Sequence, residues 1–228
     1  MNPLPILILG FSGSGKSTAI RTLNPKETFL INCLNKPLPF KNGNQSYTEL
    51  SLSKNPKGNM LTTDNYDLIN RNLIYLTNER TEIKNIVFDD SQALIIHEFM
   101  RRHSSQGKGN DVFQLYNDIA DHFWNLIFNF KLMRNDQIIF LLHHGELNEA
   151  GRIQPKTIGK LLNEKIEICS MFSIVLYAIR ESEKNYFVTQ NDGTTPAKSP
   201  MGMFDSIKIE NDLNLVKNSV LSYYKGEN

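Results

Sequence analysis

Apolar residues in this chain occur in short continuous runs, and segments with helical spacing or turn-forming residues separate them. The runs cover residues 4–9, 27–33, 83–88, 137–142 and 171–180. Because continuous apolar runs of this length are typical of strands buried on both faces, they predict a mainly parallel sheet. Helical spacing of apolar residues predicts flanking helices at residues 64–79, 92–102, 111–133 and 211–224. The pattern therefore predicts an α/β fold.

The first apolar run turns directly into a glycine-rich loop. Gly10, Gly15, Lys16 and Ser17 match the spacing G-x-x-x-x-G-K-[ST], in which glycines let successive backbone N–H groups surround a di- or triphosphate. Lys16 is expected to reach the β- and γ-phosphates, and the Ser17 hydroxyl is expected to bind magnesium. The predicted cofactors are ATP and Mg²⁺, and the predicted cofactor-binding residues are Gly10, Phe11, Ser12, Gly13, Ser14, Gly15, Lys16, Ser17 and Thr18.

The context of this short motif argues against a chance match. An apolar run of strand length precedes the loop, and helix-compatible residues follow it at 18–23. The phosphates are therefore expected at the N-terminus of a helix, where unpaired N–H groups favour negative charge.

Residues 83–90 form a second informative segment, because buried apolar residues are followed directly by Asp89 and Asp90. The carboxyl ends of parallel strands face the ligand crevice of an α/β sheet, and in P-loop proteins a carboxylate there holds magnesium. Asp89 is favoured as the metal ligand, and Asp90 as the residue that polarises water. The alternative is that Asp90 or Ser91 only caps the helix at 92–102.

The strand predicted at residues 137–142 ends in His143 and His144. Adjacent side chains on a strand point to opposite faces, so joint ligation of one ion is disfavoured. A polar residue at this strand tip can contact the γ-phosphate or its attacking water and pass the nucleotide state to the following loop. His143 is the candidate for this role, and a cap or a buried hydrogen bond is the alternative.

Two polar, glycine-containing segments carry local positive charge, at residues 103–110 and 146–160. A basic end of the helix at 92–102 also suits the helix dipole, so its charge alone does not indicate a ligand. The basic residues in and beside these segments are Arg101, Arg102, Lys108, Arg152, Lys156 and Lys160.

The remaining segments are turn-rich or form a C-terminal extension. Prolines and turn formers at residues 34–59 predict an irregular insertion or a small hairpin over the nucleotide site, with a mobile surface loop as the alternative. Residues 186–190 predict a hairpin partner for the strand at 171–180, followed by a tight turn at 191–193 and an irregular stretch at 194–204.

Composition narrows the class of protein without identifying it. The 228 residues suit one α/β domain, and the net charge of +1 means that any nucleic-acid site is a local patch. Cys33 and Cys169 lie far apart in apolar surroundings, which fits a reducing compartment better than a disulfide framework. No apolar run reaches membrane-spanning length, so a cytoplasmic protein is expected.

Several separated segments, taken in order, point to a family. GFSGSGKST, KPLPF, IVFDDSQ, KTIGKLL and AKSPMGMF resemble the phage-encoded RecA-like ATPases of the single-strand-annealing and recombination-mediator group, the Sak-type proteins. The resemblance covers most of the chain and implies one RecA-like P-loop NTPase core over residues 1–228, with a C-terminal β-hairpin extension. It implies ATP hydrolysis, binding of single-stranded DNA, and a role in phage recombination, annealing or replication in the bacterial host cytoplasm.

The resemblance also implies partners and site residues. The two DNA-facing loops would fall at residues 103–110 and 145–159, with Arg101, Arg102, Lys108, Arg152 and Lys156 as DNA-binding candidates. RecA-like ATPases act as rings or filaments, and a basic residue from a neighbouring copy completes the nucleotide site. The candidates for that residue are Lys156, Lys160 and Lys198, each of which is otherwise a solvated surface lysine. A phage single-strand-binding protein is a further candidate partner.

The chain departs from RecA near the end of its second strand. Asn32, Cys33 and Asn35 stand where the resemblance implies a catalytic glutamate, so Asp90 is the substitute base. No oligomerisation segment precedes the P-loop, which weakens the expectation of a filament. A nucleotide-gated adaptor or loader with little turnover is therefore the alternative. A small-molecule kinase is less favoured, because such kinases need an arginine-rich lid.

Overall fold

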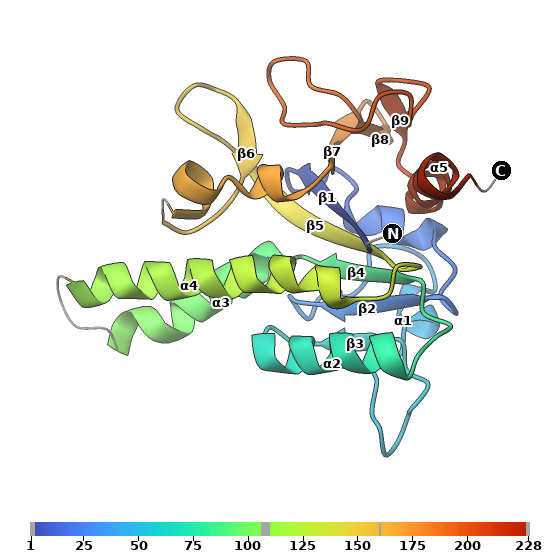
Figure 1. The fold of residues 1–228 in the computed structure, drawn as a ribbon, viewed down its shortest axis with the longest axis horizontal. Coiled ribbons are helices and arrows are strands. Elements are labelled where there is room, and N and C mark those ends of the chain that lie inside the picture. The colour runs from blue at the N-terminus through green and yellow to red at the C-terminus, as the bar shows by residue number, and fades with distance from the viewer. Residues whose placement is uncertain (1–2, 106–109, 160, 227–228) are drawn as a thin grey trace.

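The apolar runs of the sequence form the strands of one sheet in the computed structural model, which describes residues 3–105, 110–159 and 161–226 (Figure 1). The strands among these residues are β1 (Leu4–Gly10), β2 (Thr28–Asn32), β3 (Met60–Thr62), β4 (Asn85–Asp89), β5 (Ile138–Leu147), β6 (Ile153–Pro155), β7 (Ile174–Glu181), β8 (Lys184–Val188) and β9 (Lys208–Glu210).

Strand order places the two motif-bearing strands near each other without making them neighbours. The order is β3-β2-β4-β5-β1-β7-β8-β9, so β5 lies between β1 and β4. Along this order, the pairings between β3 and β7 are parallel, while β8 and β9 extend the sheet as antiparallel strands. Strand β6 lies outside this order and pairs with β5 in an antiparallel direction. The prediction of a mainly parallel α/β sheet with a C-terminal hairpin extension is confirmed.

Helices cover both faces of the sheet. They are α1 (Gly43–Ser46), α2 (Tyr66–Asn78), α3 (Gln92–Arg102), α4 (Asn110–Asn129) and α5 (Leu213–Lys225), with short 3₁₀ or π segments η1 (Ser17–Thr22), η2 (His103–Ser105), η3 (Phe130–Leu132), η4 (Leu161–Ile166) and η5 (Ile168–Met171). In Figure 1, α2, α3 and α4 form a layer in front of the sheet, and α5 lies apart from them. Among the described residues, no helix has the length and hydrophobicity needed to span a bilayer.

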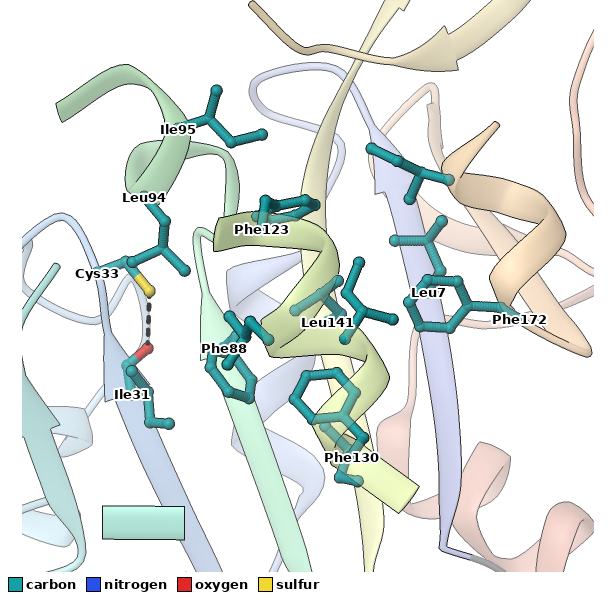
Figure 2. Packing of buried hydrophobic residues seen from close by; sticks show 14 of the residues in the cluster. Leu7, Ile31, Cys33, Phe88, Leu94, Ile95, Phe123, Phe130, Leu141 and Phe172 are labelled. Atoms are coloured by element: carbon teal, nitrogen blue, oxygen red, sulfur yellow. Dashed lines mark hydrogen bonds between the residues drawn. The ribbon is translucent and has the colours of Figure 1, made fainter. Parts of the chain in front are cut away.

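Alternation along the central strands divides the core into two clusters. Leu7 and Leu9 of β1 pack on the side of α2, α3 and α4, whereas Ile6 and Ile8 pack on the side of η1 and α5. Figure 2 shows the first cluster, where Phe123 of α4 lies close to the strands. Because both faces are covered, every central strand reads as a continuous apolar run.

Several element boundaries differ from the sequence predictions. The segment expected to form a helix after the P-loop is the short 3₁₀ segment η1. The helix predicted at 64–79 begins at Tyr66, after Asn65, whose side chain accepts a hydrogen bond from the backbone N–H of Leu68. Strand β5 runs on past residue 142 and turns back through β6, so part of the segment at 145–159 is a hairpin rather than an open loop. The three-residue strands β3 and β9 were not predicted, because they are too short for a period-2 signal.

The helix predicted at 111–133 is shorter in the structure, because α4 ends at Asn129 and is followed by η3. The apolar residues of α4 are largely buried, but Phe113 is 72% exposed. Cys33 and Cys169 are buried and free, as the sequence suggested.

Candidate nucleotide-binding site

A cleft of about 390 Å³ opens at the carboxyl ends of β1, β2, β4 and β5. Ligands bind outside the carboxyl ends of strands in open α/β sheets, because the loops that follow the strands meet there. We call it the nucleotide cleft; the lining residues used below are residues 12–18, Asn32, Lys36, Asp89, Asp90, His144, Arg180 and Asn185.

Two glycines of the P-loop are required by close approach of the chain. A Cβ atom at Gly10 would lie 2.8 Å from the carbonyl oxygen of Ala178, and one at Gly15 would lie 2.6 Å from Cγ of Asn185. Gly15 also has a φ of +91°, in the left-handed region that favours glycine. The loop therefore packs tightly against β7 and β8.

Lys16 is buried within the loop that carries it. Its Nζ donates hydrogen bonds to the carbonyl oxygens of Gly10 (2.7 Å) and Phe11 (3.1 Å). Burial lowers the pKa of the Lys16 ammonium, while the charges of Asp90 and Asp89 oppose this shift. The backbone of Gly10 and Phe11 thus holds the lysine at the cleft, and neither residue itself lines it.

The predicted magnesium ligands are brought together across 72 positions of sequence. The Ser17 hydroxyl donates to Oδ1 of Asp89 at 2.6 Å. Burial raises the pKa of Asp89 to about 6, and the hydrogen bond from Ser17 partly offsets it. A bound divalent cation would favour the ionised carboxylate, because opposite charge stabilises the charged form.

The neighbouring Asp90 has a different environment. Nε2 of His144 lies 2.8 Å from Oδ2 of Asp90, and the backbone N–H of Gln92 donates to Oδ1 at 3.2 Å. Burial acts to raise the pKa of Asp90, but the hydrogen bond from His144 and the charge of Lys16 help to leave it below its ordinary value. Asp90 is thus an ionised carboxylate at the cleft that also binds the first turn of α3.

The two histidines lie within β5, and their side chains point to opposite sides of the sheet. His143 is fully buried, lies 5.6 Å from the Phe123 ring and does not line the cleft, whereas His144 does. Nε2 of His143 lies 2.9 Å from the carbonyl oxygen of Lys156, and Nδ1 lies 2.8 Å from Oγ of Ser91. The geometry thus places His144, and not the selected His143, beside the predicted catalytic carboxylate.

His143 instead forms a neutral structural link. Burial lowers its pKa to about 4, so the ring is uncharged at neutral pH. Because a carbonyl oxygen only accepts, Nε2 carries the ring proton and Nδ1 is the acceptor. The backbone N–H of Lys156 also donates to the carbonyl oxygen of His144 at 2.8 Å. The backbone N–H and carbonyl groups of Lys156 are therefore both hydrogen-bonded to β5, at His144 and His143 respectively.

The cleft residues fit a magnesium nucleotide. Ser17 and Asp89 supply the hard oxygen donors that Mg²⁺ prefers, and the Lys16 ammonium supplies a cation for phosphate. The buried Oγ of Ser14 and Oδ1 of Asn185 lack a hydrogen-bond partner in the described part of the chain. Both residues line the cleft, so these polar atoms are available to a ligand.

Comparison with protein families agrees with this geometry. The model of the AAA domain family matches residues 2–201. The chain belongs to this family. Membership in the AAA domain family indicates a nucleotide-binding ATPase, in agreement with the P-loop and the acidic strand end. No curated protein matches the chain significantly. The narrower resemblance to phage recombination mediators stays a prediction.

Two of the predicted DNA-binding arginines are engaged in ion pairs within the chain. Arg101 lies 2.5 Å from Asp64, and Arg102 pairs with Glu98 at 2.6 Å and also with Asp118. Carboxylates that precede α2 or lie in α3 and α4 therefore balance the charges of both arginines. This pairing weakens the case that the arginines contact DNA phosphates. Lys108 lies outside the described residues.

A second cleft, of about 530 Å³, lies between the β5–β6 hairpin and residues 191–198. We call it the hairpin cleft. Arg152 and Lys198 line it, and Lys156 follows β6 in an exposed position. The backbone N–H of Ile153 donates to the carbonyl oxygen of Thr194 at 2.9 Å, so the β5–β6 hairpin and residues 191–198 are joined by a hydrogen bond. Lys160 lies outside the described residues.

The sequence did not predict several residues that line the nucleotide cleft. Those with polar or charged side chains include Lys36, His144, Arg180 and Asn185, and none of them belongs to the P-loop or the acidic strand end. Arg180 and Asn185 reach the cleft because β7 pairs with β1, which a sequence pattern does not specify. Lys36 lies in the segment at residues 34–59 that was expected over the nucleotide site. Its position shortly after Asn32, the polar end of β2, is the sequence feature that could have indicated it.

Proposed function

We propose that the chain is a Mg²⁺-dependent ATPase that binds single-stranded DNA and acts in phage recombination, annealing or replication. One observation carries the ATPase part: Lys16, the Ser17–Asp89 contact and the Asp90–His144 pair converge in a single cleft. Cation, metal ligands and an ionised carboxylate are the parts that phosphoryl transfer to water requires.

Each of these residues has a separate role in the proposal. Lys16 contacts the phosphates, while Ser17 and Asp89 hold Mg²⁺, which neutralises charge on the phosphate oxygens when bound. Asp90 orients the attacking water and accepts its proton, and His144 keeps this carboxylate ionised. Hydrolysis thus forms a bond from the water oxygen to the γ-phosphorus and releases ADP and phosphate.

The hairpin cleft supports the DNA-binding part of the proposal. Arg152 and Lys198 give it cations, and the buried Oγ1 of Thr195 has no partner in the described structure. Lys156 is exposed and follows Pro155, which lines the cleft. The lining contains no aromatic residue among the described positions, so contact with the phosphate backbone is favoured over base stacking. Such binding tolerates many sequences and weakens steeply with salt.

An assembly of several copies completes the proposal. A ring or filament would let a lysine from one copy approach the nucleotide of the next, with Lys156, Lys160 and Lys198 as the candidates. Such a cation is worth roughly 10³–10⁵ in rate where it has been measured in related phosphoryl transfer. A phage single-strand-binding protein is the proposed partner on the DNA.

ATP turnover with and without single-stranded DNA tests the proposal. At low salt, we expect Mg²⁺-dependent hydrolysis that single-stranded DNA stimulates and that added salt suppresses. The absence of both DNA binding and stimulation at low salt would reject the DNA part while leaving the ATPase part open to its own measurement.

One observation favours a second candidate, a nucleotide-gated adaptor or loader. Asn32, at the end of β2, offers no carboxylate, and its amide is hydrogen-bonded to the backbone of Lys36. Tight ATP binding with negligible turnover, with and without DNA, is the result that would select the adaptor.

A further inference from the structure

The end of β2 holds one lysine in a fixed place at the nucleotide cleft. Nδ2 of Asn32 donates to the carbonyl oxygen of Lys36 at 2.9 Å, and Oδ1 of Asn32 accepts from the backbone N–H of Lys36 at 3.2 Å. Asn32 is itself buried. A single side chain thus binds both backbone groups of Lys36, and a buried anchor restrains the exposed residue.

The neighbours of Lys36 restrict its backbone further. Asn35 has a φ of +53°, a left-handed conformation that asparagine adopts more readily than most residues and that turns the chain back toward Asn32. Pro37 disfavours the helical region for the residue before it, so extended backbone is favoured at Lys36. The conformational preferences at residues 35–37 therefore restrict the position of the Lys36 Cα atom at the cleft.

This lysine faces the metal-binding side of the cleft. Asn32 pairs with Asp89 across β2 and β4, and the backbone N–H of Cys33 donates to the carbonyl oxygen of Asp89 at 2.7 Å. Lys36 and Asp89 line the same cleft. Because Lys36 follows β2, and β2 and β5 flank β4, Lys36 lies on the far side of Asp89 from β5.

In P-loop proteins the loop backbone surrounds the α- and β-phosphates, so a γ-phosphate would extend beyond the loop toward Ser17 and Asp89, the residues that would hold magnesium. A cation beside the metal-binding carboxylate therefore meets the third phosphate more directly than it meets the first two. We propose that Lys36 is the residue by which a single chain distinguishes a nucleoside triphosphate from a diphosphate. Asn32 is the positioning residue that holds Lys36 there.

This inference rests on the proposed nucleotide site and adds a cation from within the same chain. The neighbouring copy is then needed for rapid turnover but not for preferring triphosphate. The proposal also gives a role to Asn32, which stands where the resemblance implies a glutamate. An ionised glutamate could not donate a hydrogen bond to the carbonyl oxygen of Lys36, as Asn32 does.

The same segment offers a matched control. Lys41 is exposed and lies five residues further along, but it does not line the cleft. A general effect of positive charge on nucleotide affinity would respond to Lys41→Gln and Lys36→Gln alike. A specific contact would respond only to Lys36→Gln and would be restored by Lys36→Arg.

Calorimetry with Mg²⁺, ADP and a non-hydrolysable ATP analogue provides the test. We expect Lys36→Gln to weaken binding of the analogue about tenfold, the size typical of one charge-assisted hydrogen bond, and to change ADP binding less than about twofold. Lys36→Arg and Lys41→Gln should match the unmodified protein. Equal losses for both nucleotides, or no loss for either, would overturn the inference.

Asn32→Ala tests the positioning role. It should lower the preference for the analogue over ADP by a smaller factor, and it should add nothing further in the Lys36→Gln background, because both changes remove one interaction. Unchanged ADP affinity shows that the cleft is folded in this variant. Additive effects of the two changes would contradict the positioning role, and the exposed Lys36→Gln change keeps the main inference testable if Asn32→Ala unfolds.

The failure of this inference differs from failure of the proposed function. If the unmodified protein binds neither nucleotide, the proposed function falls. If it binds both, Lys16→Ala abolishes both, and Lys36→Gln leaves their ratio unchanged, only the role of Lys36 is wrong.

Discussion

The nucleotide cleft and the hairpin cleft differ in how far their charges are organised. In the nucleotide cleft, Lys16 is buried and held by two carbonyl oxygens, and Asp89 and Asp90 each have a specific hydrogen-bond partner. In the hairpin cleft, Arg152 is exposed, and the hydrogen bonds that it makes with Asn148 come from its backbone N–H and carbonyl groups. The first cleft is preorganised, whereas the second presents adaptable surface charge.

This difference matches two kinds of ligand. A small phosphate ligand and its metal need fixed donors at fixed positions, because misplaced groups stabilise charge poorly. A flexible polyanion can be bound by mobile cations that release counterions, with little geometric demand. His144 of β5 lines the nucleotide cleft, and its carbonyl oxygen accepts a hydrogen bond from the backbone N–H of Lys156. The β5–β6 hairpin therefore connects His144 of the nucleotide cleft to Arg152 of the hairpin cleft.

The largest effect is expected from Asp90→Asn in the nucleotide cleft. This change removes the carboxylate that accepts the proton of water while preserving the shape of the residue, so hydrolysis should fall on the order of 10²–10⁴-fold. Binding of the ATP analogue should stay within a few-fold. Steady-state turnover together with calorimetry measures both quantities.

His144→Gln is the partner experiment for Asp90. It replaces the imidazole that lies 2.8 Å from Oδ2 with an amide that can still donate a hydrogen bond, so turnover should fall less than for Asp90→Asn. Full activity in Asp90→Asn would refute the assignment of Asp90 to chemistry.

An intermediate effect is expected from the hairpin cleft. Arg152→Gln and Lys156→Gln should each weaken binding of single-stranded DNA by roughly 3–10-fold at low salt and reduce the salt slope by about 1, because each removes one phosphate contact. Fluorescence anisotropy at several salt concentrations measures both. Nucleotide affinity should not change.

Arg101→Gln is the matched control for these variants. Its charge is balanced by Asp64, so DNA affinity should change less than in Arg152→Gln. If Arg101→Gln has the larger effect, the DNA surface lies along α3 and the hairpin cleft has been wrongly assigned.

The smallest effect is expected from pH, and it distinguishes the two adjacent carboxylates. The pKa of Asp89 is raised to about 6, above the value near 4 of an unfolded aspartate, so the folded state holds this proton more tightly. The contribution of Asp89 to the free energy of unfolding is therefore fully present below about pH 4 and is lost as pH rises through about 6. Relative to Asp89→Asn, the unmodified nucleotide-free protein should lose about 1–2 kcal/mol over that range.

Asp90 should behave in the opposite way. Its pKa lies below the unfolded value, so its stabilising contribution is present above about pH 4 and is lost as pH falls further. Urea denaturation of the unmodified protein, Asp89→Asn and Asp90→Asn across pH 3–7 measures both slopes. Slopes of the same sign for the two variants would show that the contrast between the two carboxylates is wrong.

The sequence predicted most reliably where local pattern and chemistry coincide. The extent of β1, the P-loop after it, the acidic end of β4 and the full extent of α3 follow from apolar runs and residue types that need no distant partner. Errors occurred where a segment depends on another part of the chain. The strand β5 continues because it has β6 to pair with, and β9 exists because β8 offers it an edge.

The sequence by itself therefore determined that this is a mainly parallel α/β protein with a P-loop and an acidic strand end, since burial and phosphate chemistry leave local marks. Only the tertiary structure decided which side chains meet at the cleft. Side-chain alternation on β5 directs His144 rather than His143 toward Asp90, and strand order brings Asn185 against Gly15 and Asn32 beside Asp89. Contacts between distant segments depend on register and strand order, which long-range packing sets.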